Sequence, residues 1–169
     1  TRIRHNVFAK ANNASTGNSA RPNLLVGAFP NNGPGSNDRY EIYGNFLYQN
    51  ASGTEGLFQG EGNVNFHDNV LFNSLGPGVF LQNNNGPVKN ARVFDNTIVG
   101  QGEGIGLRGI TPGFTQLVQG NAIFSPSPYG GSATGDNLTG GFGQAGNNFM
   151  NVQASLPGLD LHPRGGMLQ

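Results

Sequence analysis

Aromatic and cationic residues recur two positions before a regularly spaced asparagine. They are Arg4, Tyr43, His67 and Phe94, with the amide Gln119 in the fifth copy, and they precede Asn6, Asn45, Asn69, Asn96 and Asn121. Four positions before the same asparagines stand Arg2, Glu41, Asn65, Arg92 and Leu117. Aromatic faces suit sugar rings, while guanidinium and amide groups bind carboxylates and hydroxyls. The pattern predicts either a saccharide-binding track or an ordinary mixed strand face, and the candidate carbohydrate-binding residues are Arg4, Tyr43, His67, Arg92 and Phe94.

Two carboxylates have a spacing that could support glycoside hydrolysis. Asp68 and Asp95 hold equivalent places in neighbouring repeats, so stacking would bring their backbones to about 4.8 Å. Hydrolysis needs two carboxyl groups, about 5 Å apart for retention and roughly 6.5 to 9.5 Å for inversion. Each Asp precedes an Asn, however, and such pairs favour sharp bends because both residue types tolerate left-handed φ. We therefore expect Asp68 and Asp95 to serve as turn residues.

A β-elimination from a uronic acid needs a group that neutralises the carboxylate and a base that removes a proton. The residue types that could do this are His67, Lys89, Arg92 and Arg108, and no catalytic residue is assigned among them. A second outward column, expected to contain Gln59, Gln82 and Arg108, could line a groove or merely solvate a sheet. The scattered positions of His5, His67 and His162 lack metal-ligand spacing, so no metal site is predicted.

These residues are positioned by a repeat of the form apolar-x-x-Asn-x-apolar. The marker asparagines are separated by 39, 24, 27 and 25 residues, which indicates a unit of about 25 with an insertion in the first copy, from Ala11 to Arg21 and from Asn31 to Asp38. A weaker sixth copy surrounds Asn147 and Asn148. Three places before each marker stand Ile3, Ile42, Phe66, Val93 and Val118, and two places after it stand Phe8, Leu47, Leu71, Ile98 and Ile123. Both columns are expected inside.

Each unit contains short apolar runs bounded by Gly, Asn or Pro, which are typical of strands. A second run follows in each unit, at residues 24–26, 57–58, 79–81, 105–107 and 137–139. At least two strands per coil are therefore predicted, and we expect three. The residue before each Asn should bend the strand, and the asparagines should stack as a hydrogen-bonded ladder.

The repeat resembles that of the right-handed parallel β-helices of the pectin-lyase-like superfamily, most closely at residues 68–72 and 95–99. The resemblance implies an all-β solenoid of about five to six coils over residues 1–150, as part of a longer solenoid, with a C-terminal exit segment at 151–169. Residues 78–109 resemble the Lys and Arg blocks of alginate and chondroitin lyases, which makes Lys89 and Arg108, beside His67, catalytic candidates. Val79 and Leu81 stand where those lyases place acidic residues, so no calcium motif is present although calcium occurs in the family.

The composition restricts the partners. The chain has 169 residues, enough for one domain, with no Cys, 11% charged residues and a net charge of zero. Because no basic cluster exists, nucleic acid is not expected as a partner. No apolar stretch approaches the roughly 18 to 20 residues of a membrane span.

Two functions remain open. The first is a secreted carbohydrate-active or polysaccharide-binding protein, extracellular or periplasmic and bacterial, related to polysaccharide lyases or glycoside hydrolases. The second is a non-catalytic structural, adhesive or assembly solenoid whose first coil contacts another chain or missing N-terminal coils. The outward positions after the markers include Phe46, Tyr48, Val70, Phe72 and Phe124, which should be covered by a loop or a partner.

Overall fold

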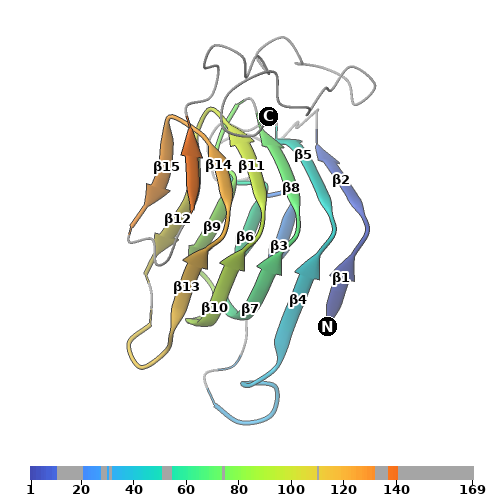
Figure 1. The fold of residues 1–169 in the computed structure, drawn as a ribbon. Helices are drawn as coiled ribbons and strands as arrows, with labels where there is room; N and C mark the ends of the chain where they lie inside the picture. The colour runs from blue at the N-terminus through green and yellow to red at the C-terminus, as the bar shows by residue number, and fades with distance from the viewer. Residues whose placement is uncertain are drawn as a thin grey trace.

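The chain forms three parallel β-sheets that run side by side (Figure 1). The structure is a computed structural model that describes residues 1–10, 21–27, 30, 32–50, 55–73, 75–109, 111–131 and 137–140. Sixteen strands and no helix occur in these residues. The expected sixth repeat at Asn147 and Asn148, the exit segment 151–169 and the insertion at 11–20 lie outside the described residues.

Each sheet takes one strand from each successive repeat. Sheet A contains β1 (Arg2–Arg4), β4 (Arg39–Tyr43), β7 (Gly62–His67), β10 (Val88–Phe94) and β13 (Gln116–Gln119). Sheet B contains β2 (Val7–Lys10), β5 (Phe46–Asn50), β8 (Val70–Asn73), β11 (Thr97–Gly100), β14 (Ala122–Phe124) and β16 (Leu138–Gly140). Sheet C contains β3 (Leu24–Val26), β6 (Phe58–Gly60), β9 (Val79–Gln82), β12 (Glu103–Arg108) and β15 (Ser127–Gly130). The predicted all-β parallel solenoid is confirmed, with the three strands per repeat that the sequence led us to expect.

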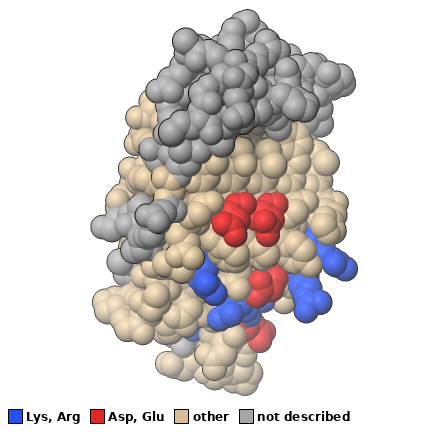
Figure 2. Space-filling model, in the orientation of Figure 1, with Lys and Arg blue, Asp and Glu red and all other residues tan. Residues whose placement is uncertain are grey.

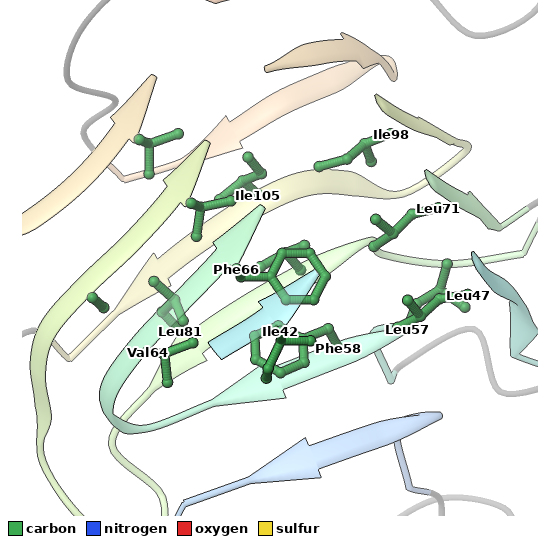
Figure 3. Close-up of a cluster of buried hydrophobic side chains, with 14 of the residues drawn as sticks. Ile42, Leu47, Leu57, Phe58, Val64, Phe66, Leu71, Leu81, Ile98 and Ile105 are labelled. Carbon is green, nitrogen blue, oxygen red and sulfur yellow. The ribbon is translucent and has the colours of Figure 1, made fainter. Parts of the chain in front are cut away.

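The core lies between the three sheets, where the two predicted apolar columns meet. Ile42, Phe66, Val93 and Val118 of sheet A and Leu47, Leu71, Ile98 and Ile123 of sheet B are all at most 1% exposed. Leu57, Phe58, Leu81 and Ile105, in or beside sheet C, complete the cluster (Figure 3). At roughly 1.5 to 3 kcal/mol for each fully buried large apolar side chain, this column supplies most of the driving force for stacking.

A sharp bend separates each sheet A strand from the sheet B strand that follows it. The residue before the marker Asn has a left-handed φ in all five repeats, at His5, Gly44, Asp68, Asp95 and Gly120, with values from 52° to 65°. The predicted bend is therefore confirmed, and so is the turn position of both Asp residues.

The marker asparagines form the predicted ladder. The backbone N–H and the Nδ2 of Asn69 both donate to Oδ1 of Asn96 at 3.0 Å, and Nδ2 also donates to the carbonyl of Ile42 at 3.0 Å. Asn45 and Asn96 repeat this pattern toward the next rung. Each side-chain amide thus satisfies buried backbone groups of its neighbours.

The sixth rung is Asn137, which corrects the sequence-based assignment of residues 137–139. The backbone N–H and the Nδ2 of Asn121 donate to Asn137 Oδ1 at 3.0 and 2.9 Å, and β16 pairs with β14 in sheet B. The strand β15 occupies the position in sheet C that the apolar pattern assigns to residues 137–139. The run Ser-Pro-Tyr-Gly of β15 holds a single large apolar side chain, so hydrophobic pattern does not reveal it as a strand.

The outward face of sheet B carries a second apolar cluster. Tyr48, Phe72, Val99 and Phe124 are each at most 8% exposed and pack together, with Phe46 beside them. The expectation that these positions are not a free surface is confirmed for Tyr48, Phe72 and Phe124, whereas Phe46 and Val70 are only partly buried.

Candidate functional site

The five candidate carbohydrate-binding residues come together on the outward face of sheet A. Arg4, Tyr43, His67 and Phe94 are successive pairing partners across β1, β4, β7 and β10, and Arg92 precedes Phe94 by two residues on the same face. In Figure 2, basic and acidic side chains lie next to one another over the lower half of the molecule, where Figure 1 places sheet A. The sequence-based grouping therefore corresponds to one surface strip, called here the sheet A strip.

The rings of the sheet A strip stack on one another. The ring centroids of Tyr43 and His67 are 5.1 Å apart with planes 10° from parallel, and those of His67 and Phe94 are 4.6 Å apart at 8°. His5 meets Tyr43 edge-on at 5.9 Å. Because both faces of the His67 ring are covered, this ring lacks the open face expected for sugar stacking.

Carboxylates hold the His67 ring in place. Its Nδ1 lies 2.7 Å from Oδ2 of Asp68, and its Nε2 lies 3.8 Å from Oε2 of Glu41. Glu41 also accepts a hydrogen bond from Asn65 Nδ2 at 2.9 Å. Glu41 and Asp68 are thus engaged with neighbouring side chains, whereas Asp95, which follows Phe94, is exposed and has no ion pair among the described residues.

The guanidinium groups of the strip are less constrained. Arg4 donates to the hydroxyl of Tyr43 at 3.3 Å, and the guanidinium of Arg92 lies 5.4 Å from the ring centroid of Phe94. Within the described part of the chain, no carboxylate lies within ion-pair distance of Arg2, Arg4 or Arg92. These three exposed cations can therefore meet an anionic ligand.

The three catalytic candidates occupy separate settings. His67 belongs to the strip. Lys89 is only 3% exposed, and its Nζ donates to the carbonyls of Ser36 at 2.8 Å and Pro30 at 3.1 Å, so it anchors the turns of residues 32–38 to β10. Arg108 ends β12 in sheet C, where it pairs with Glu103 at 2.5 Å and lies 4.3 Å from the ring centroid of Phe80.

The predicted outward column of sheet C has a different register. Gln82 pairs with Arg108, as expected, but Gln59 pairs with Phe80 instead of Gln82. The apolar run at β6 is one residue shorter than the run of β9, because Gly60 stands where β9 has Leu81. The Phe58 ring occupies the space that a side chain at position 60 would need. The predicted column matched the first polar residue after each apolar run, and it was therefore wrong to place Gln59 opposite Gln82.

Sequence reasoning placed Glu41 in an outward column and Asp68 in a turn, but it did not connect either residue with His67. Their contacts with His67 depend on the strand register and on the bend.

Neither a metal-ion cluster nor a membrane-spanning helix occurs in the described residues. No group of three or more His, Asp or Glu side chains there is arranged to hold a metal ion. No helix that is long and apolar enough to cross a membrane is found in the same residues. No protein-family model, curated protein or solved structure matches the chain.

Proposed function

We propose that this chain is a secreted, extracellular or periplasmic polysaccharide-binding protein that holds an acidic polysaccharide along the sheet A strip. The resemblance of the repeat to the right-handed helices of the pectin-lyase-like superfamily supports the substrate class. The observation that carries the proposal is the register, which aligns aromatic, polar and cationic side chains of successive coils along one face.

The geometry favours an extended polymer. Neighbouring strands of a sheet are about 4.8 Å apart, so a chain that follows the solenoid axis meets equivalent side chains on each coil. Many weak contacts in register can sum to useful affinity without a deep pocket.

The charges favour an acidic polymer. Glu41 and Asp68 are engaged with His67 and Asn65, whereas Arg2, Arg4 and Arg92 are exposed and without a carboxylate partner among the described residues. Guanidinium groups bind carboxylates in a bidentate manner. A uronate polymer would supply carboxylates both to Arg2 and Arg4 at one end of the strip and to Arg92 three coils further along.

Binding to a matched panel of uronate and neutral polysaccharides tests the proposal, with affinity electrophoresis and calorimetry as readouts. We expect the uronate polymers to bind and the binding to weaken as salt rises, because exposed charges are screened. The double variant Arg4→Gln/Arg92→Gln should weaken binding at least tenfold. Arg108→Gln is the matched control, because Arg108 lies on sheet C, and it should change nothing.

Two results would count against this function: unchanged binding by the double variant, or retention of neutral polymers only. The same incubations, followed for unsaturated products by ultraviolet absorbance, separate a lyase from a binding protein. Product formation that His67→Gln abolishes would extend the proposal to catalysis.

A structural or assembly role is the second candidate, and one observation favours it. The edge strands β1, β2 and β3 lie at the same end of the three sheets, and Val7 and Leu25 on that end are 61% and 45% exposed. Open strand edges with apolar side chains promote pairing with another chain. Light scattering over a range of concentrations should then show association that Val7→Lys reduces, and a monomer at every concentration would exclude this role.

A further inference from the structure

A cavity on the outward side of sheet C, away from the sheet A strip, is lined by groups of opposite charge. Its volume is about 280 Å³, slightly below the range of roughly 300 to 1,000 Å³ typical of small-molecule sites. Six of its lining residues carry the argument: Arg21, Leu25, Glu55, Gln59, Asn84 and Asn85. The size suits a ligand much smaller than a polysaccharide.

Glu55 is the acidic group of the cavity. Among the described residues it forms no hydrogen bond and no ion pair within 4.0 Å. Burial raises the pKa of its carboxyl above the ordinary value, although the nearby charges of Arg21 and Lys10 act in the opposite direction. A partly buried carboxylate without a bonded partner is unfavourable, and a ligand cation would relieve that cost.

Gln59 supplies a polar group to the lining of the cavity. The residue is only 4% exposed, lines the cavity, and its side-chain amide forms no hydrogen bond with any described residue. The Gln59 amide is not among the buried unpaired groups of the described residues, so it is open to the cavity. A ligand with a hydrogen-bond donor or acceptor at this point would form a hydrogen bond with the Gln59 amide.

The walls of the cavity are held before any ligand arrives. The carbonyl of Arg21 accepts hydrogen bonds from Asn50 Nδ2 at 2.8 Å and from Lys10 Nζ at 2.6 Å. On the opposite wall, the buried carboxylate of Glu61 accepts the backbone N–H groups of Asn84 at 2.9 Å and Asn85 at 2.8 Å. Fixed walls reduce the entropy that binding must overcome.

We propose that this cavity binds a small zwitterion of the α-amino acid class. The ligand carboxylate faces the Arg21 guanidinium, its ammonium group lies between Glu55 and the Gln59 amide, and its side chain packs against the exposed Leu25. A lone anion would face Glu55 and a lone cation would face Arg21, whereas a ligand with both charges complements the pair.

Calorimetric titration of the whole chain with each of the twenty common amino acids tests the proposal. We expect at least one to bind with a dissociation constant of about 1 mM or tighter. For that amino acid, the analogue without the amine and the analogue without the carboxylate should each bind at least tenfold more weakly. The absence of binding by all twenty, or equal binding by either analogue, would overturn the zwitterion site.

Variants locate the site. Glu55→Gln should weaken binding at least tenfold, and Gln59→Met, which keeps the size but removes the amide, should also weaken it, so the test survives if one variant does not fold. Glu103→Gln, on the same sheet but paired with Arg108 outside the cavity, is the matched control and should bind normally. Unchanged affinity in both folded cavity variants would overturn the assignment. Polysaccharide binding by Glu55→Gln should match wild type, which separates this site from the sheet A strip.

Discussion

At the scale of single residues, Tyr48 shows an uncompensated polar group. Its ring stacks on that of Phe72 at 5.8 Å within the apolar cluster on sheet B, and its hydroxyl is buried without a hydrogen-bond partner among the described residues. A buried, unpaired hydroxyl costs about 1 to 3 kcal/mol. We expect Tyr48→Phe to raise the free energy of unfolding by about 1 kcal/mol or more, measured by urea denaturation. Tyr43→Phe is the control, because the Tyr43 hydroxyl is bonded to Arg4, and it should not stabilise the protein.

The same hydroxyl gives the stability a pH dependence. Burial raises the pKa of the Tyr48 phenol above its ordinary value near 10.0, so the folded state favours the protonated form. The stability from that preference is fully present below pH 10 or so and is lost as the pH rises through the folded pKa. Wild type should therefore lose more stability than Tyr48→Phe between pH 9 and 11, and parallel losses would contradict the burial of this hydroxyl.

At the scale of elements, the Asn ladder links each sheet A to sheet B bend to the next. Removing the Asn96 side chain deprives Asn69 of the acceptor for its backbone N–H and its Nδ2, and removes one donor from each of the carbonyls of Phe66 and Phe94. At about 1 to 3 kcal/mol for each buried group, Asn96→Ala should destabilise the fold by more than about 3 kcal/mol. Asn6→Ala, at the exposed end of the ladder, should cost about 1 kcal/mol or less, because water can replace the amide. Similar losses at both positions in denaturant titrations would show that burial does not govern the ladder.

The sequence predicted an element correctly where one residue type at a fixed spacing determines the local structure. The apolar columns, the left-handed residue before each marker and the ladder through Asn121 all follow from residue type and spacing. The register of sheet C did not follow, because Gly60 leaves room for the Phe58 ring and shifts the alignment. The rung at Asn137 was missed, since it follows Asn121 after 16 residues rather than about 25. The pair Asp136-Asn137 carries the same motif as Asp68-Asn69 and was the available signal.

The candidate site was predictable only in part. Register brought the residues of the sheet A strip together as expected, since a period of two fixes which side chains face outward. The orientation of the rings was not predictable, because stacking depends on side-chain rotamers. Lys89 and Arg108 were candidates by chemical type, but their contacts with Ser36 and Glu103 depend on tertiary packing. The cavity on sheet C joins segments from three repeats and has no local sequence pattern. The right-handed winding and the number of coils stay predictions.

At the scale of the whole molecule, the described strands make a nearly one-dimensional stack. Every strand pairs only with the equivalent strands of the adjacent repeats, so stability should be close to a sum over repeats and their interfaces. One complete repeat can therefore be removed, because the repeats on either side of it can pair with each other through equivalent strands.

Deleting residues 97–121 tests this additivity. The deletion removes β11, β12 and β13 and joins Asn96 directly to Ala122, which takes the place of its pairing partner Thr97. Asn96 can then donate to Asn137 as Asn121 does, and β14 can pair with β8. We expect a folded protein with a single cooperative transition in urea, whose m-value falls roughly in proportion to the 25 residues removed from 169. Deleting only residues 97–108 removes β11 and β12 but leaves β13, a sheet A strand, directly after β10; this control should lose the cooperative transition. If the 25-residue deletion also loses it, the repeats do not act as exchangeable units.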